Sequence, residues 1–410
     1  MRIVDLFSGA GGLTFGFYYQ LMDEEFIRTD NEFIFANEFD KFAAEAFSQN
    51  YPDINMIQCD IKELTKDPLR IKNLIGEEDV DIVIGGPPCQ SFSTIGKRRF
   101  DDKAKLYSQY LKMLSIIQPK MFLFENVKGM LSMREQIPQY NELGTPLIDE
   151  KGNEITKPGR LIMEVIEDQF LHIENAEGYS VLGKSILNAK NYGVPQNRER
   201  VFIVGIRNDL YNKVSWQYPE PTHGPDRLEY LTVKESISDL PELKENQSIN
   251  QYGKPAQNEF QALMRGNNDI LTEHFCGSHS ERLKKIIEAV KPGEGRPYIN
   301  HLVEIGKLPK ECYLTSGYNN TYGRLVENKP SPTITNNMCT PSALRCIHYK
   351  QNRELSPREG ARIQSFPDWY RFKGNKAHVT TQIGNAVPPV LAMAIARKIE
   401  DTIEEINNEC

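Results

Sequence analysis

The stretch Val80–Ser93, VDIVIGGPPCQSFS, decides the expected fold. Its apolar half, Val80 to Ile84, predicts a short buried strand, and the two glycines and two prolines that follow can neither continue a strand nor begin a helix. Cys89 is therefore expected on a loop at the carboxyl end of a strand. In an open parallel α/β sheet, ligands bind in the crevice outside these strand ends. Cys89 is a candidate nucleophile on this ground, and the alternative is a small buried hydrophobic side chain.

Two further apolar strands are flanked by polar residues that a reactive site needs. Glu125 follows the expected strand from Met121 to Phe124, and QNRER at 196–200 precedes the strand from Val201 to Ile206. The thiolate is the reactive form of cysteine, and nearby positive charge lowers the pKa of a thiol. A thiol, a carboxylate and two guanidiniums at one sheet edge therefore indicate a catalytic site.

Six motifs in a fixed order span nearly the whole chain. They are DLFSGAGGL (Asp5–Leu13), GGPPCQSFS (Gly85–Ser93), ENV (Glu125–Val127), QNRERVF (Gln196–Phe202), REGARIQSFPD (Arg358–Asp368) and QIGNAVPP (Gln382–Pro389). In these motifs the chain resembles the DNA (cytosine-5) methyltransferase family of the bacterial restriction-modification type. The resemblance implies an α/β fold with a doubly wound, mostly parallel sheet of the S-adenosylmethionine-dependent methyltransferase type, and a second, smaller, irregular target-recognition domain.

The length of 410 residues favours a large domain plus a smaller one. Between residues 208 and 352 the pattern becomes rich in Pro, Asn and Gly, with one clear helix expected from Ser280 to Val290. We predict a catalytic, cofactor-binding domain whose first part is 1–207, a target-recognition domain at 208–352, and a return to the catalytic domain at 353–410. Residues 130–160 read as a surface excursion, and 179–187 and 201–206 as an antiparallel strand pair.

Composition places limits on location and partners. The hydrophobic share of 39% is that of an ordinary globular protein, no apolar run approaches the length of a membrane span, and the chain enters a strand without a signal peptide. We therefore expect a cytoplasmic protein with no membrane association. The net charge of −7 alone does not indicate nucleic acid, although a neutral recognition domain can still carry a basic face. The seven scattered cysteines, with no CxxC pair, argue against a disulfide framework and a zinc site.

The resemblance implies S-adenosyl-L-methionine as cofactor and no metal. The expected cofactor contacts are Phe7, Ser8, Gly9, Gly11, Gly12, Leu13, Glu38, Asp60 and Asn385. By resemblance the glycine loop holds the amino-acid end of the cofactor, Phe7 lies against the adenine, and Asp60 contacts the adenine amino group; a carboxylate at Glu38 can accept both ribose hydroxyls. The loop could instead be a plain strand-to-helix turn, and Asp60 a helix N-cap. The GAGG spacing of the glycine loop is not the GxGxxG of a nicotinamide-dinucleotide site.

The resemblance also assigns catalytic roles. The Cys89 thiolate attacks C6 of a flipped cytosine, Glu125 stabilises a proton at N3, and Arg198 hydrogen-bonds the base carbonyl. Arg200, with Arg198, is placed to lower the pKa of the thiol. Pro88 contributes its backbone. The remaining substrate contacts expected are Ser91, Gln196 and Arg324.

Double-stranded DNA is the expected partner, read by the polar and aromatic segment TSGYNNTYGRL at 315–325, in which Arg324 is a guanine reader. The same residues could only form turns. The basic cluster at 97–99 could grip phosphates beside the target or be merely solvated. We further expect a monomer, acting separately from any cognate restriction endonuclease. An RNA (tRNA) methyltransferase of the same fold and an inactive DNA-binding homologue remain alternatives, whereas a nicotinamide oxidoreductase is disfavoured.

Overall fold

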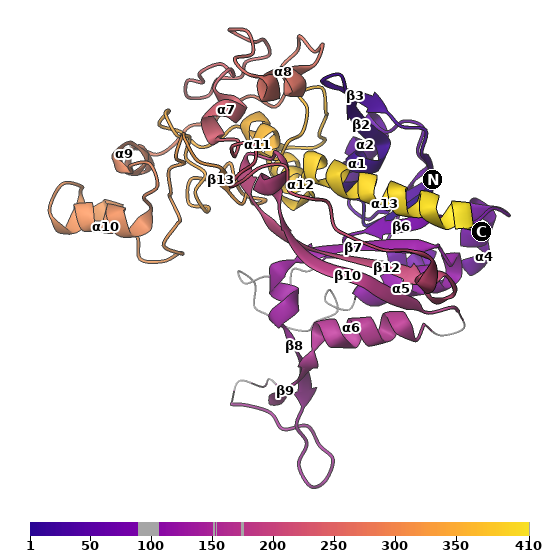
Figure 1. Cartoon of the computed structure of the whole chain (residues 1–410). Coiled ribbons are helices and arrows are strands. Elements are labelled where there is room, and N and C mark those ends of the chain that lie inside the picture. Colours follow the sequence, from indigo (N-terminus) through magenta and orange to yellow (C-terminus); the bar gives the residue numbers. More distant parts are fainter. Residues whose placement is uncertain (89–105, 151, 153, 174–175, 410) are drawn as a thin grey trace.

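A seven-stranded sheet forms the centre of the molecule (Figure 1), in the order β10-β12-β7-β6-β1-β4-β5. The computed structural model describes residues 1–88, 106–150, 152, 154–173 and 176–409. The strands of this sheet are β1 (Arg2–Leu6), β4 (Glu32–Glu38), β5 (Met56–Gln58), β6 (Ile82–Gly85), β7 (Met121–Val127), β10 (Tyr179–Asn188) and β12 (Glu199–Arg207). Strands β7, β6, β1, β4 and β5 are parallel, and β12 runs antiparallel between β7 and β10. The expected mostly parallel sheet with its antiparallel pair is confirmed.

The sheet is buried on both faces because its strands are apolar on both. In β1, Ile3 belongs to one hydrophobic cluster and the neighbouring Val4 to the other, as expected when successive side chains point to opposite faces. One face packs against α1 (Gly12–Tyr18), α2 (Lys41–Asn50) and α13 (Pro389–Glu409). The other packs against α3 (Ile61–Leu64), α4 (Pro68–Ile75), α5 (Tyr107–Ile117) and α6 (Ile162–Leu171). This is the doubly wound arrangement.

The C-terminal helix α13 returns to the start of the chain and packs along α1 (Figure 1). Gly16 makes the approach possible, because a Cβ there would lie 2.2 Å from the carbonyl carbon of Ala392. The helical stretch 376–408 has the length and apolarity of a membrane span. However, 72% of the 18-residue apolar window within it is buried inside the fold. Its apolar character is therefore explained by packing in the core.

Two β-hairpins lie outside the central sheet. Their strands were not predicted from the sequence. Strands β2 (Tyr19–Met22) and β3 (Glu25–Arg28) follow α1. Strands β8 (Arg134–Pro138) and β9 (Thr156–Leu161) lie within the predicted surface excursion and project away from the body (Figure 1).

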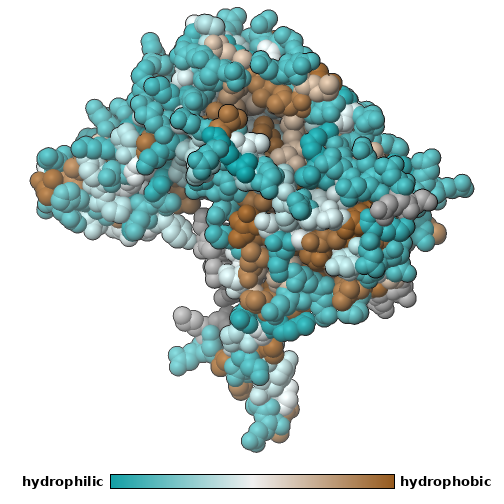
Figure 2. Space-filling view, viewed as in Figure 1, coloured by the Kyte–Doolittle hydropathy of each residue, from teal (hydrophilic) through white to brown (hydrophobic). Residues whose placement is uncertain are grey.

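The segment 208–352 holds more helices than the one predicted. It contains α7 (Val233–Ile237), α8 (Glu259–Arg265), α9 (Glu281–Ala289) and α10 (Arg296–Glu304), and its β13 (Ser331–Pro332) pairs with β11 (Gln196–Asn197). Residues around α9 and α10 have a small hydrophobic core of their own, whereas α7 packs into the main core. The α9–α10 lobe extends from the body in Figure 1 and carries a mostly hydrophilic surface in Figure 2. Helices α11 (Pro357–Ile363) and α12 (Lys376–Asn385) then lead back to α13.

Candidate active site and cofactor loop

The loop between β1 and α1 has a backbone that most side chains cannot adopt. Phe7, Gly9 and Gly11 have φ angles of 57°, 57° and 92°. Glycine populates this left-handed region at little cost. A Cβ on Gly11 would in addition lie 2.3 Å from Cε2 of Tyr51. The GAGG sequence is therefore required by both backbone conformation and close packing.

A carboxylate from the neighbouring strand holds this loop. The Gly9 N–H donates to Oε2 of Glu38 at 2.8 Å, and the Asp40 N–H donates to Oε1 at 2.7 Å. Burial raises the pKa of Glu38, and these two backbone donors oppose that shift. Since a carboxylate offers about four lone-pair sites, Glu38 can accept further hydrogen bonds from a ligand. Asp60 caps α3 by accepting from the Lys62 N–H at 2.9 Å, so the capping alternative holds for one of its oxygens.

The C-terminal motif meets the same loop. A Cβ on Gly12 would lie 2.5 Å from the carbonyl oxygen of Val387, so the Asn385 segment passes directly beside the start of α1. Asn385 itself is exposed, and Leu13 is buried in the core. Ser8 is also mostly buried and donates to the Asn37 carbonyl at 3.2 Å. Leu13 and Ser8 thus support the loop from inside the fold, whereas Asn385 is exposed beside it.

The loop has the features that an adenosyl cofactor needs. Gly9 has open space around it, since a Cβ there would meet no heavy atom within 4 Å. Phe39, next to Glu38, leaves 72% of its surface exposed, and an exposed aromatic ring offers a face on which a planar base can stack. Next to the loop, Oδ1 of buried Asp5 has no hydrogen-bond partner in the part of the chain that the structure describes, and burial raises the pKa of Asp5 to about 8. The residues present therefore fit S-adenosylmethionine.

The catalytic edge of the sheet brings together Glu125 and Arg200. The Arg200 Nε lies 3.2 Å from Oε1 of Glu125, and the two side chains are 14% and 13% exposed. The antiparallel register of β12 against β7 produces this pair, because it places Arg200 opposite Val127, two residues beyond Glu125. Burial raises the pKa of Glu125, while the positive charges of Arg200 and Arg198 oppose the rise. Glu125 can therefore hold a proton more readily than an exposed glutamate.

The segment Gly86–Pro88, which precedes Cys89, passes beside the Glu125 carboxylate. A Cβ on Gly86 would lie 2.7 Å from Oε2 of Glu125. The side chain of Asn126, which is 2% exposed, donates to the Pro87 carbonyl at 3.4 Å and so holds the Pro-Pro segment. Pro88 is half-buried at the end of this segment. The predicted residues Cys89 and Ser91, and the basic cluster 97–99, lie outside the described residues.

Two residues of the QNRER motif do not have the roles predicted for them. Arg198 is 1% exposed, and its guanidinium donates to the carbonyls of Ile334, Gly384 and Ala386 at 3.0, 2.9 and 2.9 Å. Gln196 is fully buried, donates to the side chain of Gln364, and accepts from the Ile334 N–H at 2.8 Å. These contacts correct the prediction that Arg198 and Gln196 bind the substrate. Arg200 is the arginine that faces the catalytic carboxylate.

Arg324 is also a structural residue. It is 5% exposed and donates to four backbone carbonyls and one side-chain oxygen, those of Ile287, Val290, His348, Gln351 and Asn352. A guanidinium with all its donor groups engaged inside the fold cannot read a guanine. The prediction of a base contact by Arg324 is therefore wrong. The exposed part of the segment is 315–319, where Tyr318 leaves 53% of its surface accessible.

The comparisons with known proteins identify the family of the chain. The sequence model of the C-5 cytosine-specific DNA methylase family matches residues 1–147 and 160–401. The chain belongs to this family. It is 34% identical to the Type II methyltransferase M.DdeI of Desulfomicrobium norvegicum, covering 99% of this chain and 90% of that protein, and 31% identical to M.XorII of Xanthomonas oryzae pv. oryzae, covering 97% and 84%.

Solved structures share the fold over the whole length. A protein of an Escherichia coli prophage, assigned as a DNA modification methyltransferase, superposes with a TM-score of 0.69 at 24% identity and covers 98% of this chain and 99% of its own. DNMT2 of Spodoptera frugiperda matches with a TM-score of 0.55 at 14% identity, covering 97% and 99%. The family match leaves 148–159 unmatched, which is most of the distal part of the β8–β9 hairpin.

Proposed function

We propose that this chain methylates C5 of cytosine within a short duplex DNA sequence, with S-adenosyl-L-methionine as methyl donor. The observation that carries the proposal is the Glu125–Arg200 pair, 3.2 Å apart at the carboxyl end of β7 and beside the Gly86–Pro88 segment. Membership of the C-5 cytosine-specific DNA methylase family supports the reaction and the donor. When bound, S-adenosylmethionine supplies the methyl group in an electrophilic, sulfonium-activated form.

Cys89 and Glu125 act on the cytosine ring. The Cys89 thiolate adds to C6, and Glu125 holds a proton at N3, so that the electron pair released into the ring makes C5 nucleophilic. After methylation at C5, the C5 proton is lost and the C6–sulfur bond breaks, which returns the thiolate. The raised pKa of Glu125 supports its part, because a proton-transfer group works best with a pKa near the working pH. Arg200 orients Glu125 and supplies the positive charge that favours the thiolate.

The cofactor contacts that we propose are the exposed ones of the loop region. Glu38 accepts the ribose hydroxyls, Phe39 stacks on the adenine, and Asn385 and the backbone at Gly9 contact the amino-acid end. Phe7 and Asp60 remain proposed adenine contacts. Ser8, Gly11, Gly12 and Leu13 shape the loop.

The segment 208–352 is proposed as the target-recognition domain, between catalytic segments 1–207 and 353–410. Its exposed polar and aromatic run at 315–319 supports a role in base reading. We also propose a cytoplasmic monomer that acts separately from a cognate restriction endonuclease. The relatives named Type II methyltransferases support the restriction-modification context.

The deciding experiment measures methyl transfer from labelled S-adenosylmethionine to unmethylated duplex DNA and to tRNA, for the wild type and for Cys89→Ser, followed by mapping of 5-methylcytosine. We expect label in DNA at one short recurring sequence and none with the variant. Label only in tRNA would identify the RNA enzyme instead, and no label with the wild type would indicate an inactive DNA-binding homologue.

A further inference from the structure

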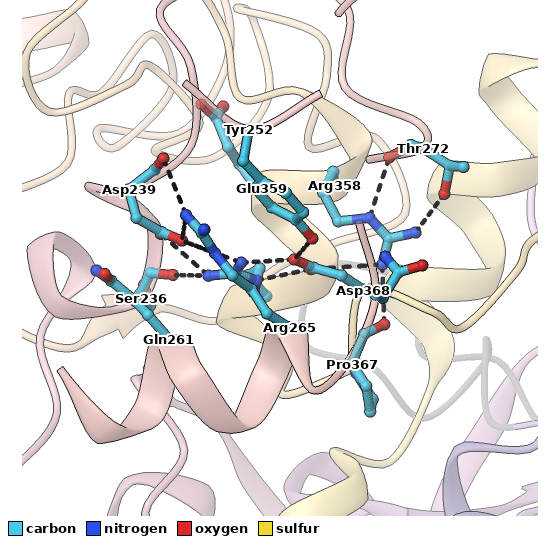
Figure 3. Close-up of polar contacts among 12 residues, drawn as sticks. Ser236, Asp239, Tyr252, Gln261, Arg265, Thr272, Arg358, Glu359, Pro367 and Asp368 are labelled. Carbon is cyan, nitrogen blue, oxygen red and sulfur yellow. Dashed lines mark hydrogen bonds and ion pairs between the residues drawn. The ribbon is translucent and has the colours of Figure 1, made fainter. Parts of the chain in front are cut away.

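The described part of the recognition segment is connected to the cofactor loop by a short series of buried hydrogen bonds. At one end, Arg358 of α11 donates from Nε to the carbonyl of Thr272 at 3.1 Å and from Nη2 to its Oγ1 at 2.9 Å (Figure 3). The same Nη2 group donates to the carbonyl of Tyr370 at 2.9 Å. Arg358 is fully buried, its bond to Tyr370 is buried as well, and the two bonds to Thr272 are partly buried. One guanidinium therefore joins residue 272 of the segment 208–352 to residue 370.

At the other end, two tyrosine hydroxyls hold the cofactor loop. The Tyr370 hydroxyl donates to the carbonyl of Ala10, and the Tyr51 hydroxyl donates to the carbonyl of Gly11 at 2.7 Å. The two hydroxyls lie 3.3 Å apart, and both rings are fully buried. Burial raises the pKa of Tyr370 and of Tyr51, so both hydroxyls keep their protons.

A second contact, between the Asn50 side chain and the Arg371 backbone, fixes the positions of Tyr51 and Tyr370 relative to each other. Asn50 at the end of α2 donates to the Arg371 carbonyl at 2.7 Å and accepts from the Arg371 N–H at 3.0 Å. The backbone beside Tyr51 is thus fastened to the backbone beside Tyr370. A movement of the 367–371 turn would shift both hydroxyls, and with them the two carbonyls of the loop whose φ angles at Gly9 and Gly11 are positive.

We propose that Tyr370 is a positioning residue that couples the recognition segment, through Arg358 and Thr272, to the cofactor loop. DNA bound to the recognition segment then raises the affinity of the loop for the cofactor, and the cofactor raises the affinity for DNA by the same factor. The inference rests on the proposed assignment of the loop to S-adenosylmethionine.

The test measures the dissociation constant of S-adenosylhomocysteine by titration calorimetry for the full-length chain, with and without unmethylated plasmid DNA that the wild type methylates. Tyr370→Phe removes one hydroxyl and leaves the Ala10 carbonyl buried without that donor, so we expect binding to weaken by about 5- to 50-fold. Thr272→Val removes the Oγ1 acceptor far from the loop. This variant keeps the hydrogen bond from Arg358 Nε to the Thr272 carbonyl and the ion pair between Arg358 and Glu273. We therefore expect unchanged binding without DNA and a reduced enhancement by DNA.

The matched control is Tyr179→Phe, since Tyr179 is another fully buried tyrosine whose hydroxyl donates to a backbone carbonyl, that of Pro119 at 2.8 Å. Wild-type affinity and enhancement are expected for it at a similar loss of melting temperature. The coupling is overturned if Tyr370→Phe matches this control, if Thr272→Val keeps the full enhancement, or if the wild type shows none. Phe39→Ala separates the two proposals, because unchanged binding in that variant would refute the cofactor site itself.

Discussion

Two buried carboxylate–guanidinium sites differ in the direction in which their surroundings shift the pKa of the carboxylate. At the sheet edge, Glu125 has one ion pair among the described residues, to Arg200, and burial raises its pKa despite that charge. At the joint between α11 and the recognition segment, burial also opposes charge on Asp368, but Arg362 outweighs it and the pKa of Asp368 is lowered.

The difference lies in the number of donors that the described residues offer each carboxylate, and Figure 3 shows the surroundings of Asp368. Asp368 receives Arg362 Nε at 2.6 Å on one oxygen, and Nη2 at 2.5 Å and the Tyr252 hydroxyl on the other. The same arginine also donates to Asp239 at 3.1 Å. A buried carboxylate with many fixed donors stays ionised and locks two segments together, whereas one with a single donor keeps the capacity to hold a proton.

The largest expected effect follows from replacing the proton-holding carboxylate. Glu125→Gln keeps the size of the side chain and an oxygen for Arg200 but cannot stabilise a proton at N3. We expect kcat for methyl transfer to fall by about 10²- to 10⁴-fold with little change in melting temperature. The control is Glu199→Gln, whose side chain is 44% exposed on the adjacent strand. An activity of Glu125→Gln within a few fold of the wild type would remove Glu125 from the reaction.

Loss of the ion pair between Asp368 and Arg362 should lower the free energy of unfolding rather than the rate of methyl transfer. Asp368→Asn leaves Arg362 buried with half of its charge partners, and breaking such a pair costs about 3–5 kcal/mol in the free energy of unfolding. Urea unfolding measures this loss. Asp209→Asn, which breaks the more exposed pair with Arg207 at 2.7 Å, should cost less than about 1 kcal/mol. Equal losses of unfolding free energy in the two variants would show that the buried pair of Asp368 and Arg362 stabilises the fold no more than a surface pair does.

The catalytic half could be predicted from sequence because its geometry follows from simple periodicity. Apolar runs mark the parallel strands, and polar residues at their carboxyl ends must meet at one edge, which is why Glu125, Glu38 and the glycine loop lie at the same edge of the sheet. The helix N-cap at Asp60 was likewise predicted, and its carboxylate accepts a backbone N–H in the first turn.

The errors arose where side chains reach across the sequence. Arg198 and Arg200 differ by two positions, and nothing in QNRER shows that one donates to carbonyls more than 130 residues away while the other faces Glu125. Arg324 misled for the same reason. The exposure of Phe39 was not predicted, although an aromatic residue directly after Glu38 at the end of a strand is a readable signal.

Arg324 sharpens the comparison as a third kind of buried guanidinium, one whose donors go to carbonyls and an amide oxygen. Arg324→Lys supplies at most three donors for these five acceptors. We expect a loss of about 2 kcal/mol in unfolding free energy and weaker binding to all DNA sequences alike. Competition binding with unrelated duplexes measures the second effect. A change of preferred sequence would instead restore Arg324 as a base reader.

The smallest effect concerns Asp5, a buried carboxyl that has the Thr14 hydroxyl as its hydrogen-bond donor and no charged partner among the described residues. Burial raises its pKa from 3.8 to about 8, so the folded state holds this proton more tightly than the unfolded chain. The stabilisation is complete below about pH 4 and is lost as the pH rises to about 8. Between pH 6 and 7 we expect the free energy of unfolding to fall by about 1 kcal/mol through this group. Asp5→Asn should remove that slope in urea unfolding, and parallel pH profiles for the two proteins would show that Asp5 is ionised in the fold. A flat profile for the variant would place Asp5 with Glu125, as a carboxyl whose protonation is set by how few donors surround it.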